Sequence, residues 1–102
     1  MALHELKDKD GRVYAFEIDN LLVSKRRVCK IVRSIPGVRV LFFSREDEFC
    51  EFEVDGQKFT VWEPWGDNSH YWVGPQPPQW CEQIALVREA FLQDFLAGGF
   101  SK

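Results

Sequence analysis

The chain has 102 residues, a formal net charge of −3 and 45% hydrophobic residues. This length predicts a single domain over residues 1–102, and the composition is typical of a globular chain rather than a disordered one. The acidic balance argues against general affinity for nucleic acid, and no apolar run approaches the length of a membrane span.

The three cysteines, Cys29, Cys50 and Cys81, have neither zinc-site spacing nor an even number for disulfide pairing. The first residues also lack the basic and apolar segments of a secretory signal. We therefore expect a cytoplasmic protein with free thiols and without a cofactor.

The first predicted elements are a strand and a helix. Residues 1–11 are polar and end in the turn-forming pair Asp10-Gly11, and residues 12–18 then alternate between apolar and polar side chains, which predicts a strand.

Ser24 is a suitable N-cap for a helix that reaches about Ser34. Its expected buried stripe has helical spacing: Val28, Ile31, Val32 and Ile35. Arg26, Lys30 and Arg33 lie on the opposite side, where we expect a solvated basic face.

The middle of the chain has the clearest pattern, a hairpin around Asp55-Gly56. This dipeptide is typical of two-residue hairpin turns, and it pairs residues 49–54 with residues 57–62. Glu53 is then opposite Lys58, and Phe49 is opposite Trp62. The apolar residues of both strands share one face: Cys50, Phe52, Val54, Phe59 and Val61.

Residues 38–43 are expected to pair with the first strand of this hairpin. A four-residue loop would turn Arg39 into the buried face, whereas a five-residue loop over residues 44–48 turns it outward, so the second register is preferred. That register predicts three buried apolar pairs: Val38 with Val54, Val40 with Phe52, and Phe42 with Cys50.

The preferred register also predicts an aromatic corner on the outer face of the sheet, made of Phe43, Phe49 and Trp62. Three adjacent aromatic side chains would form an apolar patch that is unusual on a monomer. Either another part of the chain covers this corner, or a second protein does.

The last third of the chain begins with residues 63–69, where Pro64, Gly66 and Asp67-Asn68 break the strand pattern. A short strand over residues 70–73 and an extended proline-rich connector over residues 74–78 follow. A helix is then predicted from about residue 79 to residue 97. Its buried stripe is expected to contain Trp80, Ile84, Val87, Phe91 and Phe95.

These elements predict an α+β fold in the order β-α-β-β-β-β-α. We expect an antiparallel sheet of four to five strands with two helices on one face. The position of the first strand, residues 12–18, within the sheet stays open.

Residues 62–72 hold the residue types that chemistry would need. Glu63, Asp67 and His70 could converge for acid–base catalysis or for metal binding, although no catalytic or nucleotide-binding motif accompanies them. The simpler interpretation is that the tryptophans pack this segment onto the sheet, while its polar residues bond to their own backbone.

The sequence leads to the hypothesis of a small, non-catalytic binding protein. It would engage a protein partner or a second copy of itself, with no role for nucleic acid or a membrane. Its size and acidic charge are similar to those of inhibitor or immunity-type proteins. The expected contact residues are Phe43, Phe49, Trp62, Glu63, Trp65, Asp67, His70 and Tyr71. The alternative hypothesis is a small enzyme, or a binder of a small molecule or metal, that uses Glu63, Asp67 and His70.

Overall fold

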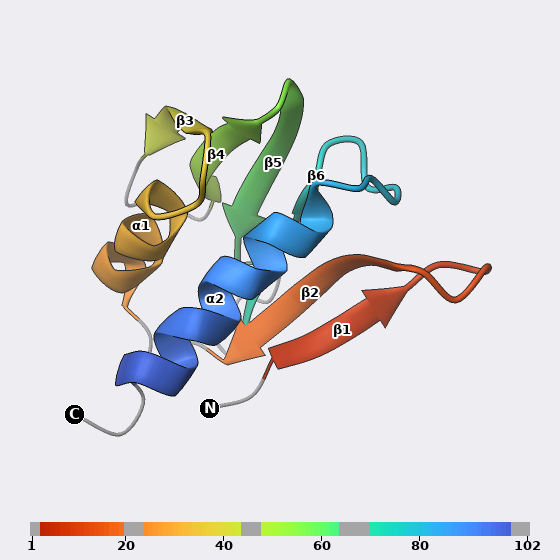
Figure 1. Cartoon of the computed structure of the whole chain (residues 1–102), viewed down its shortest axis with the longest axis horizontal. Coiled ribbons are helices and arrows are strands. Elements are labelled where there is room, and N and C mark those ends of the chain that lie inside the picture. The colour runs from red at the N-terminus through yellow and green to blue at the C-terminus, as the bar shows by residue number, and fades with distance from the viewer. Residues whose placement is uncertain (1–2, 20–23, 44–47, 64–69, 99–102) are drawn as a thin grey trace.

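The computed structural model describes residues 3–19, 24–43, 48–63 and 70–98, without the side chains of residues 48, 49, 97 and 98. The fold is α+β, and its strands form a six-stranded antiparallel sheet in the order β1-β2-β6-β5-β4-β3 (Figure 1). The elements are β1 (Leu3–Lys7), β2 (Val13–Asp19), α1 (Lys25–Arg33), β3 (Val38–Phe43), β4 (Glu48–Val54), β5 (Gln57–Trp62), β6 (His70–Pro75) and α2 (Ile84–Gly98).

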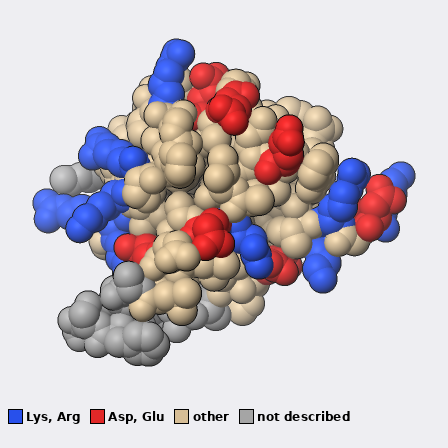
Figure 2. Space-filling model, viewed as in Figure 1, with Lys and Arg blue, Asp and Glu red and all other residues tan. Residues whose placement is uncertain are grey.

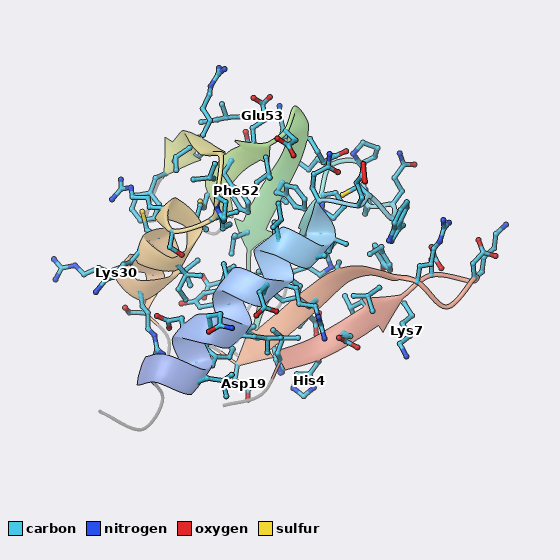
Figure 3. All side chains as sticks on the ribbon, viewed as in Figure 1. His4, Lys7, Asp19, Lys30, Phe52 and Glu53 are labelled. Atoms are coloured by element: carbon cyan, nitrogen blue, oxygen red, sulfur yellow. The ribbon has the colours of Figure 1, made fainter. Side chains whose placement is uncertain are left out.

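Both helices lie on the same face of the sheet, with α1 in front of β3 and β4 and α2 running diagonally across the middle (Figure 1). One hydrophobic core fills the space between helices and sheet, and Phe52 points into it (Figure 3). Strand side chains that alternate away from this core form what we call the helix-free face. The residues of this face that matter below are His4, Glu17, Asp19, Phe42, Glu51, Glu53, Trp62, His70 and Trp72.

Helix α1 forms as the sequence predicts. The side chain of Ser24 accepts a hydrogen bond from the backbone N–H of Arg27 at 3.1 Å, which satisfies one donor of the first turn. The predicted stripe is buried: Val28, Ile31, Val32 and Ile35. Burial of this stripe against β3 and β4 holds α1 on the sheet.

The predicted hairpin is also confirmed. Asp55 and Gly56 both have positive φ, 49° and 79°, as a turn of type I′ requires. Glu53 pairs with Lys58 in the register that this turn imposes. The register places Phe52 beside Phe59 in the core, where the two rings stack with centroids 5.3 Å apart.

The sheet is larger than predicted, because residues 3–7 form an additional strand. β1 pairs with β2 at the edge of the sheet, so β2 lies between β1 and β6. This strand was missed because its short sequence, Leu3–Lys7, is mostly polar and only one of its faces packs against the core. The edge position makes such a composition stable, since an edge strand needs fewer apolar side chains.

Two register irregularities change the predicted pairing at the far end of β3 and β4. Val38 lies opposite Val54 and Val40 opposite Phe52, as expected. The β3–β4 register then shifts between Val40 and Phe42, so that Phe43 rather than Phe42 lies opposite Cys50. A second shift, between β4 and β5, places Glu48 rather than Phe49 opposite Trp62. Because each bulge adds one residue to one strand, it reverses the face on which the following side chains lie.

Helix α2 begins later than predicted. Ile84 donates its backbone N–H to the carbonyl of Cys81, and the four-residue ladder starts only with the bond from Val87 to Gln83. Trp80 therefore precedes the helix. It does not join the buried stripe but is 41% exposed, with the guanidinium of Arg12 4.9 Å from the centroid of its ring. No helix among the described residues is long and apolar enough to cross a membrane.

Candidate functional site

Two of the polar residues predicted for chemistry, Glu63 and His70, have different ion-pair partners. Glu63 forms an ion pair with Lys25, the first residue of α1, with Oε1 3.3 Å from Nζ and a side chain only 7% exposed. His70 instead lies on the helix-free face, opposite Asp19. Glu63 and His70 thus take part in different contacts, and Asp67 lies outside the described residues.

Tyr71 belongs to the core rather than to a contact surface. It is 4% exposed and lies opposite Ile18 in the β2–β6 ladder. Burial, together with the negative charge of Glu63, raises the pKa of Tyr71 to about 12. A buried ring held in its neutral form supports the sheet but offers no area to a partner.

The predicted aromatic corner is rearranged. Trp62 lies on the helix-free face as expected and is 37% exposed. Phe43, after the bulge, lies instead beside α1 on the helix-covered side. The side chain of Phe49 and all of Trp65 lie outside the described residues.

Trp72, which the sequence analysis did not select, is the cross-strand partner of Trp62. The two tryptophans lie opposite each other on β5 and β6. The indole of Trp72 extends over Gly74, where an added Cβ would come within 2.6 Å of Cη2 and within 2.8 Å of Ala15 Cβ. Because Gly74 has no side chain, the indole of Trp72 can lie against the sheet at this position. The two indoles give the centre of the helix-free face an apolar surface.

A second apolar area lies at the β3 edge. Phe42 is 48% exposed and Leu41 36% exposed, and Phe42 lies opposite Glu51 on the helix-free face. Large apolar side chains on an edge strand are unusual, because natural proteins usually protect such edges with charge. Arg39 is the one cation on this strand, and it pairs loosely with Glu53 at 3.8 Å.

A basic groove lies on the other side of the molecule, between α1 and the end of β3. Its cavity volume is about 630 Å³. Lys and Arg side chains gather over α1 at the left of the molecule (Figure 2), and Lys30 points away from the core (Figure 3). The groove is lined by Lys25, Arg26, Cys29, Lys30, Arg33 and Phe43.

Two of the three thiols, those of Cys50 and Cys81, do not have the properties of activated nucleophiles. All three cysteines are free. Burial raises the pKa of Cys50 to about 12, and burial also raises the pKa of Cys81. Both groups are thiols rather than thiolates at neutral pH, so they lack the form that attacks electrophiles or binds metals.

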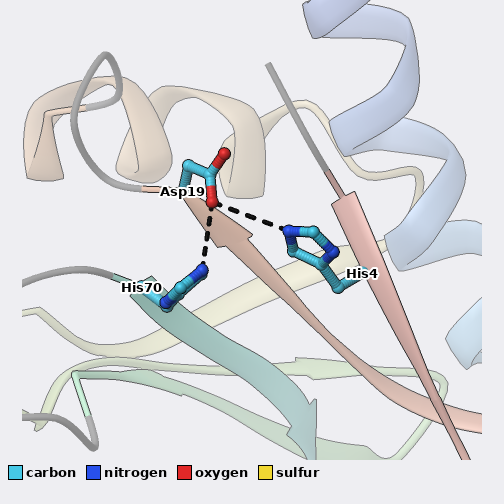
Figure 4. A group of neighbouring side chains, drawn as sticks. All are labelled: His4, Asp19 and His70. Atoms are coloured by element: carbon cyan, nitrogen blue, oxygen red, sulfur yellow. Dashed lines mark ion pairs between the residues drawn. The ribbon is translucent and has the colours of Figure 1, made fainter.

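Three side chains of the kinds that bind metal ions converge on the helix-free face, between β1, β2 and β6 (Figure 4). Asp19 Oδ1 lies 3.1 Å from His70 Nε2 and 3.7 Å from His4 Nε2. The two imidazole rings face each other edge to face, with centroids 5.7 Å apart. Exposed fractions of 54% for His4, 38% for Asp19 and 31% for His70 show that the cluster is open to solvent.

Of these three residues the sequence analysis selected only His70, and with other neighbours. His4 was not predicted as a site residue, because the polar composition of residues 1–11 does not indicate a strand. One feature of the sequence could have pointed to the cluster, namely that the chain has only two histidines.

No protein-family model matches the chain, and no curated protein or solved structure matches it either. The function must therefore be inferred from the surfaces and clusters of the chain itself.

Proposed function

We propose that this protein is a small binding protein that engages a protein partner through the helix-free face of its sheet. The observation that carries the proposal is the exposed Trp62, which lies opposite Trp72 on the face that neither α1 nor α2 covers. Exposed tryptophan at the centre of a surface is typical of the few residues that dominate binding energy at interfaces. Phe42, 48% exposed on the same face, extends the apolar area toward the sheet edge.

The charges of this face favour a basic partner over a second copy of the chain. The described part of the face carries two cations, Arg39 and Lys58. It carries more acids, namely Glu17, Asp19, Glu51 and Glu53. Two copies packed face to face would bring like charges together, whereas a partner with a basic rim would neutralise them. An inhibitor or immunity-type protein that covers a basic surface of its target is one form of this function.

The proposal is non-catalytic, and it includes a cytoplasmic location. Glu63, which the alternative hypothesis uses as a catalytic group, is bound to Lys25 beside α1. Three unpaired thiols, at Cys29, Cys50 and Cys81, suit a reducing compartment. The contact residues of the proposal are Trp62, Trp72 and Phe42, with Glu17 and Glu51 as the charged rim.

The test compares Trp62→Ala with Trp80→Ala. The two tryptophans are exposed to a similar extent, Trp62 by 37% and Trp80 by 41%. Trp80 lies elsewhere, however, because it packs against Arg12 at the turn between β1 and β2. Proteins captured from a host lysate by the wild type would be purified, and their dissociation constants measured by calorimetry. We expect a partner whose affinity falls at least about tenfold with Trp62→Ala and stays unchanged with Trp80→Ala.

Two results would overturn the proposal. Equal affinity of wild type and Trp62→Ala for every captured protein would show that the face is not the contact. Light scattering that finds a dimer, converted to monomer by Trp62→Ala but not by Trp80→Ala, would replace the partner with a second copy. Circular dichroism spectra would establish that each variant is folded.

A further inference from the structure

The chain has only two histidines, and the fold brings both of them to one carboxylate. His4 comes from β1, and Asp19 and His70 lie opposite each other at the ends of β2 and β6 (Figure 4). Side-chain alternation puts all three residues on the helix-free face, because their neighbours Ile18 and Tyr71 are buried in the core. The strand order β1-β2-β6 therefore builds the cluster from three adjacent strands.

We propose that His4, Asp19 and His70 form a binding site for a divalent transition-metal ion of the zinc type. This inference goes beyond the proposed binding function and does not rest on it. It adds a metal site at the β1–β2–β6 end of the same face, beside the β2–β6 pair of Glu17 and Trp72.

The spacing of the ligand atoms agrees with such a site. Two ligand atoms that each lie about 2.1 Å from a tetrahedral zinc ion are about 3.4 Å apart. Asp19 Oδ1 lies 3.1 Å from His70 Nε2 and 3.7 Å from His4 Nε2, so two of the three separations bracket this value. The three ligand atoms all lie within 4.8 Å of one another.

The donor set selects the class of metal. Imidazole nitrogens suit zinc, copper, nickel and iron, whereas magnesium and calcium prefer oxygen ligands alone. Two histidines and one carboxylate supply three protein ligands and leave at least one position for water or for a group from a partner. The open, partly exposed position of the cluster is compatible with such an additional ligand.

An ordinary ion pair explains the cluster less well. One protonated imidazole is enough to balance one carboxylate, yet both histidines direct Nε2 to the same oxygen, Asp19 Oδ1. One metal ion can be coordinated by both imidazoles and the carboxylate at the same time, so each of the three side chains has a partner.

The test uses the untagged chain, freed of metal with a chelator and titrated with Zn²⁺ in a calorimeter. We expect one ion to bind per chain, with Mg²⁺ giving no heat of binding. His4→Ala, His70→Ala and Asp19→Asn should each weaken zinc binding by at least about tenfold, the loss that removal of even an outer partner of a ligand produces. Glu53→Gln, a carboxylate change elsewhere on the helix-free face, and Cys81→Ser should leave the affinity unchanged.

A second readout does not depend on heat. Since the chain has two histidines, their imidazole signals can be followed individually by nuclear magnetic resonance, and both should move together as Zn²⁺ is added. Absence of zinc binding, or binding that survives His4→Ala and His70→Ala, would overturn the proposal. Shifts at one histidine alone would do the same. None of these results changes the Trp62 experiment, so the two proposals fail separately.

Discussion

Arg27 on α1 donates a hydrogen bond from Nε to Oδ2 of Asp94 on α2 at 2.7 Å, although the two residues are 67 positions apart in the chain. The guanidinium carbon of Arg27 also lies 5.9 Å from the ring centroid of Phe95, which borders the core. The pair is only partly exposed, 20% for Arg27 and 31% for Asp94. It joins the two helices directly and so fixes their relative position above the sheet.

Asp94→Ala should lower the free energy of unfolding by about 1–3 kcal/mol. The change removes a charge-assisted hydrogen bond and leaves a shielded guanidinium, whose Nη2 is already buried without a partner among the described residues. Urea unfolding measures the loss. The control is Glu89→Ala on the exposed side of α2, where only a bond from Gln93 is lost and the expected change stays within about 0.5 kcal/mol. Equal losses in the two variants would show that the Arg27–Asp94 pair stabilises the fold no more than an exposed side-chain hydrogen bond does.

Ser24 is the predicted stability determinant of α1. Ser24→Ala removes the acceptor for the Arg27 backbone N–H and should cost about 1 kcal/mol. Ser24→Asp keeps an acceptor and adds a negative charge where the first turn carries Lys25, Arg26 and Arg27 but no acid, so it should equal or exceed the wild type in stability. Thermal unfolding of the two variants checks the order. A less stable Ser24→Asp protein would contradict the explanation.

Gly74 should not tolerate a side chain. An added Cβ would lie 2.6 Å from Trp72 Cη2, so Gly74→Ala should lower the free energy of unfolding by about 1–3 kcal/mol through overpacking. Part of this loss should disappear when the same change is made in Trp72→Ala, because the colliding indole is then absent. A double-mutant cycle with urea unfolding gives the coupling. Strict additivity would mean that Trp72 does not lie over Gly74.

Stability should fall at alkaline pH. Burial raises the pKa of Cys50 from 9.0 to about 12 and that of Tyr71 from 10.0 to about 12, so the folded state keeps protons that the unfolded chain has released. Because the folded state then binds more protons, the contribution of these two groups to stability is constant below about pH 9 and decreases from there toward pH 12. Urea unfolding between pH 7 and pH 11 measures the slope. Cys50→Ala should reduce the slope above pH 9, and an unchanged slope would contradict this origin.

The sequence predicts an element correctly where a turn or a helix cap determines it. Asp55-Gly56 determined the hairpin register, and Ser24 together with the stripe that starts at Val28 determined α1. These features act over a few residues and depend little on the rest of the fold. The alternation of Phe16 and Ile18 was enough to predict β2 for the same reason.

The features that were missed depend on contacts between distant segments. β1 is stable only because β2 is there to pair with it, and the bulge before Phe42 depends on how β3 twists against β4. The His4 cluster needed both the missing strand and the position of β2 between β1 and β6. Neither follows from the composition of a single segment, so the candidate site could be predicted only in part.

The site depends on β1, β2 and β6 bringing His4 and His70 together on the helix-free face. Two-dimensional nuclear Overhauser spectra of the metal-free protein test this claim most directly, since the two histidines are the only source of imidazole ring signals. With ring centroids 5.7 Å apart, the rings should give cross-peaks to each other. The claim is contradicted if no such cross-peak appears and the His70 ring instead shows contacts to core rings such as Phe16 or Phe91.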